Sequence, residues 1–144
     1  MHIDDFVERM NHILPLLKRR MVSTEASPFL KGTITMPQYF ALELLYDMKD
    51  AKMSDMAREL NITGPAVTGI IDRLEKAGFT ERVPSKSDRR VVFVKLTKKG
   101  IVLAEDMRVN LAKSLKETFG QLSEKERAAY ITILEKVYKI LTNK

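Results

Sequence analysis

The sequence predicts a mainly α-helical protein with one small β-hairpin, and three observations support this fold class. Apolar residues recur every three or four positions through most of the chain, which is the spacing of amphipathic helices. A short and a longer helical pattern are joined by a tight turn at residues 61–63. Two β-rich runs then flank a loop within residues 79–97. Together these features predict a winged helix-turn-helix with additional helices on both sides.

We expect three segments along the 144 residues, a length sufficient to bury a hydrophobic core. Residues 1–34 should form an N-terminal dimerisation helix and a loop, and residues 35–97 the winged helix-turn-helix. Residues 98–144 should form C-terminal dimerisation helices.

The N-terminal helix is predicted from the apolar spacing that starts at Ile3. Pro15 removes a backbone hydrogen bond and crowds the preceding turn, so a kink or break is expected near residues 11–14. Residues 23–34 are rich in Ser, Pro and Gly and predict a loop.

A second helix should run to about Met48 after a capping box, in which Thr35 accepts from free amides and Gln38 reaches back. Pro37 fits its first turn. The inward residues are expected to include Phe40, Leu44 and Leu45. Residues 50–52 are expected to form a turn, with Met53 in a brief extended piece.

The helix-turn-helix follows directly. Ser54 should cap a short helix over residues 55–60, with Met56, Ala57 and Leu60 facing inward. Thr63 should cap a longer helix from Gly64 to Ala77, and Gly78 can adopt the left-handed conformation that ends helices.

The last third predicts two amphipathic helices. Thr97 should cap the first, which ends at Gly120, and the capping box of Ser123 and Glu126 should open the second. The final helix is apolar around much of its circumference, which favours a homodimer. The alternative is an intramolecular bundle of the first, fifth and sixth helices.

The formal net charge of +6 and the pI near 9.5 predict a polyanionic partner, either nucleic acid or an anionic membrane surface. Seven basic and two acidic residues between Thr80 and Lys99 contribute +5 of this charge. Membrane binding is disfavoured because the apolar helix faces are needed for packing.

Several functional classes are disfavoured. The chain has no cysteine, so disulfides, thiolate metal sites and cysteine redox sensing are excluded. The two histidines, His2 and His12, have no metal-ligand spacing, and no phosphate-binding loop or nucleophile elbow occurs. We therefore expect no enzyme, no metal and no cofactor. Acidic residues at the N-terminus do not fit a signal peptide, so a cytoplasmic location is expected.

The outward face of the longer helix is expected to meet double-stranded DNA in the major groove. It is formed by small residues, with Arg73 at its border; the candidates are Thr63, Gly64, Pro65, Thr68, Gly69 and Arg73. Because long side chains are few, we predict methyl and backbone contacts rather than a guanine-reading arginine. The alternative is that the small residues only allow tight packing.

The loop of the hairpin supplies the second group of candidates, which are Lys86, Asp88, Arg89 and Arg90. The two arginines suit a narrow minor groove. Asp88 is expected to hold one of the arginines by a charge-assisted hydrogen bond. The candidates for phosphate contacts, which add affinity without sequence information, are Arg73, Arg82, Lys86, Lys95, Lys98 and Lys99.

The runs at residues 54–60, 72–78, 87–90 and 96–100 resemble the MarR family of bacterial and archaeal transcription regulators. The most specific match is Asp88-Arg89-Arg90 followed by Leu96-Thr97 and Gly100. The resemblance implies a homodimeric repressor or other regulator that binds a palindromic operator. It also implies that Asp88 pairs with Arg90, which enters the minor groove. Gly69 stands where many members carry a polar or basic side chain.

The resemblance further implies a small-molecule pocket, often for aromatic or phenolic anions, without a motif that assigns its residues. Tyr39, Tyr46, Arg19 and Arg20 are candidates by helix location only. Since oxidation-sensing members depend on cysteine, ligand binding or an unregulated role remains. The competing hypothesis is a winged helix that contacts another protein without specific DNA binding, although such a wing has no need for a charge of +5.

Overall fold

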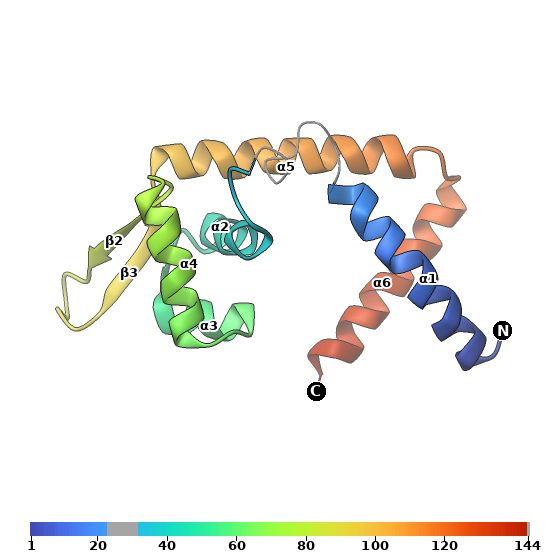
Figure 1. Cartoon of the computed structure of the whole chain (residues 1–144), viewed down its shortest axis with the longest axis horizontal. Helices are drawn as coiled ribbons and strands as arrows, with labels where there is room; N and C mark the ends of the chain where they lie inside the picture. Colours follow the sequence, from blue (N-terminus) through green and yellow to red (C-terminus); the bar gives the residue numbers. More distant parts are fainter. Residues whose placement is uncertain (23–31, 144) are drawn as a thin grey trace. The chain divides into compact units, whose positions relative to one another are not determined.

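The computed structural model describes residues 1–22 and 32–143 (Figure 1). The chain divides into two compact units, Met1–Val109 and Asn110–Lys144. Within the described ranges, no helix has the length and apolar character needed to cross a membrane.

Helix α1 (Ile3–Val22) is a single continuous helix with Pro15 inside it. Of the predicted kink or break near residues 11–14, the break is therefore wrong. One proline removes a single backbone hydrogen bond, and the bonds of the turns on either side are enough to continue the helix. The predicted loop at 23–34 falls largely outside the described residues, apart from Gly32, which turns with a φ of 65°, and the two residues after it.

Helix α2 (Met36–Met48) begins as predicted. Thr35 accepts from the backbone of Gln38, whose side chain accepts from the Thr35 amide at 2.7 Å. The inward position predicted for Phe40 is wrong, because its side chain is 51% exposed. The buried face of α2 is formed by Ala41, Leu42 and Leu45 instead. Phe40 precedes this face by one helical step of 100°, which turns its ring outward.

Residues 50–52 form strand β1 (Asp50–Lys52) rather than the predicted turn. Ala51 is buried and pairs with Val94 of the hairpin, so this short segment is extended because the edge of the sheet supplies its hydrogen bonds. Helix α3 (Met53–Leu60) starts immediately after it. Ser54 is thus inside the helix and not its cap, and the capping position is taken by Lys52 without a side-chain hydrogen bond.

Helix α4 (Gly64–Lys76) buries one apolar face, formed by Val67, Ile70, Ile71 and Leu74. Gly78 follows with a φ of 82°, the left-handed conformation expected after this helix. Strands β2 (Thr80–Pro84) and β3 (Val92–Leu96) form the predicted hairpin. With β1 they make an antiparallel sheet of order β1-β3-β2. The predicted fold class is confirmed.

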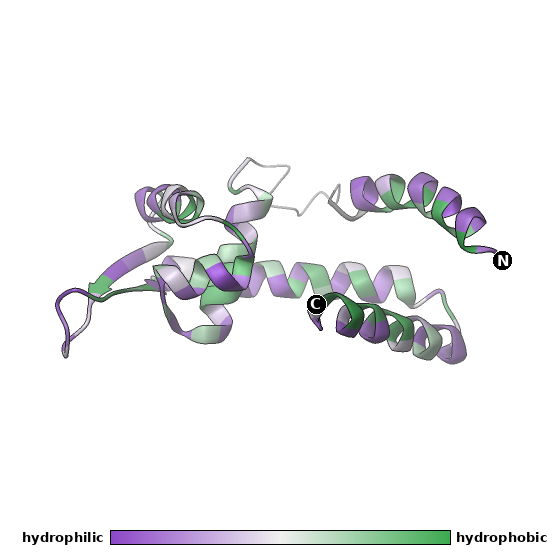
Figure 2. Cartoon of the chain, turned by 90° about the horizontal axis from the view of Figure 1, so that it is seen from below, coloured by the Kyte–Doolittle hydropathy of each residue, from purple (hydrophilic) through white to green (hydrophobic). Residues whose placement is uncertain are grey.

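Helix α5 (Lys98–Phe119) begins after Thr97, whose side chain accepts from the Gly100 amide at 3.1 Å. The boundary between the two units falls within α5. Helix α6 (Glu124–Thr142) opens with the predicted capping box of Ser123 and Glu126 and has no buried residue. Figure 2 shows apolar residues distributed along α6. The core instead lies among α2, α3, α4 and the sheet, with Ala104 and Met107 of α5 added to it.

Candidate nucleic-acid interface

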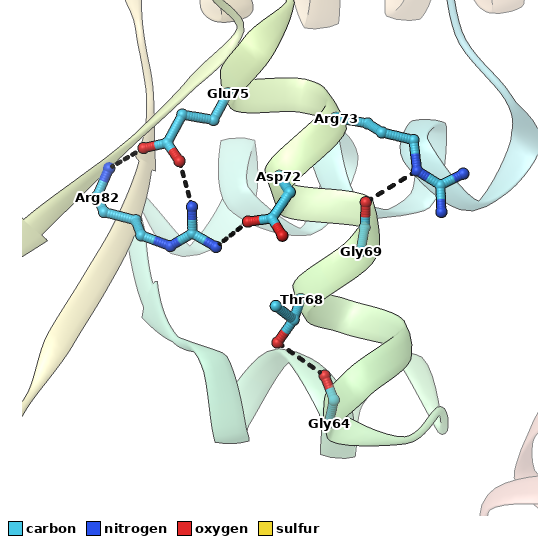
Figure 3. A network of polar contacts seen from close by, with 7 residues as sticks. All are labelled: Gly64, Thr68, Gly69, Asp72, Arg73, Glu75 and Arg82. Atoms are coloured by element: carbon cyan, nitrogen blue, oxygen red, sulfur yellow. Dashed lines mark hydrogen bonds and ion pairs between the residues drawn. The ribbon is translucent and has the colours of Figure 1, made fainter.

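The N-terminal half of α4 presents the small residues that the sequence placed on its outward face. Thr63, Gly64, Pro65 and Thr68 are exposed, and Gly69 is half-buried. The Thr63 side chain accepts from the Ala66 amide at 3.3 Å and thereby caps the helix. The Thr68 hydroxyl donates to the Gly64 carbonyl at 3.1 Å (Figure 3). Its proton is thus used within the helix, which leaves the methyl group and the oxygen lone pairs for a partner.

Arg82 links the hairpin to α4 through two carboxylates. Its guanidinium donates to Asp72 at 2.6 Å and also to Glu75, and its backbone amide donates to Glu75 at 3.2 Å (Figure 3). The hydrogen bond to Asp72 is the main reason that the pKa of Arg82 is raised. The structure engages this cation in ion pairs, whereas the sequence had suggested a phosphate contact. It also neutralises Asp72, which would otherwise repel phosphates from this face.

Arg73 lies on the same helix and turns back over Gly69. Its Nε donates to the Gly69 carbonyl at 3.0 Å. A Cβ atom on residue 69 would stand 3.4 Å from Nη2 of Arg73. The guanidinium thus occupies space that a side chain at position 69 would need.

The loop of the hairpin is organised by two short polar side chains, Ser85 and Asp88. The Ser85 hydroxyl accepts from the amides of Ser87 at 3.3 Å and Asp88 at 3.4 Å. The Ser85 amide donates to the Val91 carbonyl at 2.9 Å and closes the loop. Sequence reasoning missed Ser85, although a serine at the start of a loop is a common turn signal.

Asp88 contacts Arg90 differently from the expectation. Its Oδ1 accepts from the backbone amide of Arg90 at 2.9 Å. In the described part of the chain, no ion pair joins the Asp88 carboxylate to the guanidinium of Arg89 or Arg90. The aspartate therefore shapes the loop, and both arginine side chains extend from it exposed.

The sequence model of the MarR family matches residues 34–92, which span the helix-turn-helix and most of the hairpin. The chain is 33% identical over 119 residues to YfiV, an HTH-type transcriptional regulator of Bacillus subtilis. That alignment covers 83% of this chain and 74% of YfiV. The chain belongs to the MarR family. It is accordingly a transcriptional regulator and not an enzyme, as predicted.

Two solved structures with DNA resemble this MarR-family chain. FabT of Streptococcus pneumoniae in complex with DNA has a TM-score of 0.84 and 27% identity, and the match covers 95% of this chain and 98% of FabT. A mutant of MarR from E. coli with operator DNA has a TM-score of 0.70 and 28% identity, with coverage of 91% and 92%. Both matches extend well beyond residues 34–92.

The basic charge of this MarR-family regulator is concentrated at the hairpin loop more than the sequence indicated. Three of the seven cations between residues 80 and 99 have partners at the base of the hairpin. Arg82 binds Asp72 and Glu75, Lys95 lies 3.2 Å from Glu81, and Lys99 donates to the Ala77 carbonyl at 2.8 Å. For the others, no ion-pair or hydrogen-bond partner of the side chain lies among residues 1–22 and 32–143; these are Lys86, Arg89, Arg90 and Lys98.

Among the residues suggested for a small-molecule pocket, Tyr46 lines a cavity of about 380 Å³ within the first unit. The lining is mixed, with the apolar side chains of Leu45, Leu96 and Ile101 and the charged side chains of Lys49, Lys95 and Glu105. The Tyr46 hydroxyl donates to Glu105 at 3.2 Å, and this hydrogen bond raises the pKa of the tyrosine. Arg19, Arg20 and Tyr39 do not line this cavity.

Proposed function

We propose that this chain binds double-stranded DNA sequence-specifically as a homodimer on a palindromic operator and acts as a ligand-responsive repressor. The observation that carries the proposal is the pairing of two exposed elements on one domain. The small-residue face of α4 is accessible at its N-terminal end, and Lys86, Arg89 and Arg90 are exposed on the hairpin loop. A helix of this kind enters the major groove, while a cationic loop suits an adjacent narrow minor groove.

The internal ion pairs support this assignment over protein contact. Asp72 and Glu75 lie on α4, yet both are paired with Arg82 and therefore present less negative charge to a phosphate backbone. The cations of the loop keep their charge exposed. This separation of charge favours a polyanion at the loop.

Exposed apolar residues on the flanking helices support a homodimer. Helix α6 exposes Ile133 by 61%, Tyr138 by 68% and Leu141 by 66%. Helix α1 and the second half of α5 also expose large apolar side chains, among them Leu14, Val109 and Leu111. Helices that expose this many large apolar side chains favour a partner surface, and a second copy in two-fold symmetry is the commonest one. A two-fold dimer matches the two half-sites of a palindrome.

A small aromatic or phenolic anion would fit the cavity beside Tyr46. Its volume of about 380 Å³ is within the range of small-molecule sites. The apolar side chains of Leu45, Leu96 and Ile101 would contact a ring, and the ammonium group of Lys49 would attract an anionic substituent. An occupant would touch α2, β3 and α5 together, so it could alter how the DNA-binding elements are held.

Selection of bound sequences from random duplex DNA by the full chain tests the proposal. We expect a recovered site with two inverted half-sites about one helical turn apart, and light scattering that gives twice the mass of one chain. Recovery of no sequence preference would overturn the assignment of specific binding. A mass of one chain would instead favour the intramolecular bundle of the first, fifth and sixth helices.

A further inference from the structure

The outward face of α4 contains one long cationic side chain, that of Arg73, among its small residues. On a helix, side chains tilt toward the N-terminus and reach the residue one turn earlier. Arg73 follows this rule, and its Nε donates to the Gly69 carbonyl at 3.0 Å (Figure 3). Gly69 lies between Pro65 and Arg73 in successive turns of the outward face. The arginine thus brings its charge toward the middle of that face.

Gly69 leaves room for the end of the Arg73 side chain. A Cβ atom on residue 69 would stand 3.4 Å from Nη2 of Arg73, which is van der Waals contact. A side chain that extends beyond Cβ toward Nη2 would compete with the guanidinium for the same space.

The guanidinium is held in place but keeps its binding capacity. Of its five N–H donors, the structure uses the one on Nε. Neither terminal nitrogen hydrogen-bonds to another residue in the described ranges, and the side chain is exposed. The Nε hydrogen bond favours this orientation of the side chain, and an oriented side chain has less entropy to lose on binding. Two parallel N–H groups on Nη1 and Nη2 match the O6 and N7 acceptors of guanine in the major groove.

The other arginine close to α4 is unavailable for this task. Both terminal nitrogens of Arg82 already donate to carboxylates, those of Asp72 and Glu75. We propose that Arg73, positioned over Gly69, reads a guanine in each half-site and is the main specificity-determining residue of α4. This assignment rests on the proposed DNA-binding function. It departs from the sequence-based expectation of methyl and backbone contacts rather than a guanine-reading arginine, and of a phosphate contact for Arg73.

The test uses the full chain, the site selected from random DNA, and duplexes in which each base pair of that site is replaced in turn. For the parent we expect one G·C pair per half-site whose replacement weakens binding roughly 10- to 100-fold. For Arg73→Ala and Arg73→Lys we expect a similar loss of affinity for the selected site. Replacing that G·C pair should then change the affinity of either variant by less than about twofold. Lysine keeps the charge but lacks the planar guanidinium. Loss of discrimination by Arg73→Lys would therefore show that the two-pronged guanidinium geometry is needed, not the charge alone.

Substitutions at position 69 provide a matched pair. Gly69→Leu should abolish discrimination at the same base pair although Arg73 is still present, because the leucine displaces the guanidinium. Gly69→Ala should retain discrimination, since a single methyl group requires only a small shift of a flexible side-chain end. In an Arg73→Ala background, Gly69→Leu should have no further effect on discrimination.

Two results would overturn the assignment. If Arg73→Ala lowers the affinity for all duplexes equally and lowers the salt dependence of binding, the residue contacts a phosphate. If Arg73→Ala discriminates as the parent does, the residue does not read the site. A parent chain that selects no sequence would instead contradict the proposed function itself, so the two failures are distinguishable.

Discussion

A Cβ atom on Gly100 would stand 2.0 Å from the carbonyl oxygen of Phe79. The first turn of α5 therefore packs directly on the backbone between α4 and β2. Hydrogen bonds fix this junction: the Thr97 amide donates to the Phe79 carbonyl at 3.0 Å, and the Thr97 hydroxyl donates to the Gly78 carbonyl at 2.6 Å. The Lys99 ammonium donates to the Ala77 carbonyl and lies 4.7 Å from the centre of the Phe79 ring. The first turn of α5 is thus joined to the end of α4 by several direct contacts.

Gly100→Ala should destabilise the protein by about 1 to 3 kcal/mol, the range for overpacking a filled site. The obstacle is a backbone oxygen, which cannot rotate away as a side chain would. Urea unfolding at fixed protein concentration measures the change. Gly64→Ala is the matched control, since its Cβ would meet no atom within 4 Å and should not lower stability. Equal unfolding midpoints for Gly100→Ala and the parent would contradict the close packing.

Arg82→Met should destabilise the protein by about 1 kcal/mol, the upper end for partly exposed ion pairs. The substitution keeps most of the apolar stem but leaves Asp72 and Glu75 without their shared cation. The loss should be smaller in 1 M salt than at low salt, because screening already weakens the parent's pairs. Lys95→Met, which removes a single exposed pair with Glu81, is the control and should cost less. A loss independent of salt would indicate packing rather than charge.

Ser123→Ala should raise the pKa of Glu126. In the parent, hydrogen bonds from the Ser123 hydroxyl and then from its amide lower this pKa below its ordinary value of 4.5. A lowered pKa in the folded state stabilises the protein above the unfolded value, and this contribution is lost as the pH falls through the folded value. The stability advantage of the parent over Ser123→Ala should therefore be present at neutral pH and shrink in acid. Carboxyl titration by NMR checks the pKa, and an unchanged value would contradict the capping box.

Local signals predicted most helix ends well, with Ser54 as an exception, because the causes are local. The capping boxes at Thr35 and Ser123, the cap at Thr63 and the turn at Gly78 each depend on residues within one turn of the chain. Strand β1 could not be predicted in this way. Its three residues are extended because Ala51 pairs with Val94, more than forty residues later. The exposure of Phe40 likewise depends on where the core lies, which the apolar spacing of α2 left open.

In the candidate site, too, features with local causes were predicted and features set by tertiary contacts were not. The small-residue face of α4 and the exposed arginines of the loop followed from sequence pattern alone. The contacts between them did not, because Arg82 meets Asp72 and Glu75 from a different element. Charge counting treated all seven cations as equivalent, whereas their carboxylate and carbonyl partners are set by tertiary structure. The position of Arg73 over Gly69 was also hidden, since a glycine in a sequence does not show what fills its place.

Asp88→Asn should bind DNA nearly as well as the parent, while Asp88→Ala should bind more weakly. The reason is that Asp88 accepts from the backbone amide of Arg90 at 2.9 Å, and an amide oxygen can replace the carboxylate in that bond. Alanine cannot accept, so the loop would lose its turn. Affinities for the selected duplex measure both variants. A strong loss with asparagine would indicate that the aspartate acts through an ion pair to an arginine side chain instead.

Arg90→Ala should weaken binding to the selected site by about 1 to 3 kcal/mol, the range for one good groove contact. The loss should be greatest where the sequence beside each half-site has a narrow minor groove, because the negative potential is strongest there. Binding by the parent should fall steeply with added salt, as expected when several phosphates are neutralised. Lys95→Ala is the control for charge alone, since Lys95 is paired with Glu81 at the base of the hairpin and should contribute little. Equal affinity of Arg90→Ala and the parent would remove this arginine from the interface, and a flat salt response would favour a protein partner for the whole wing.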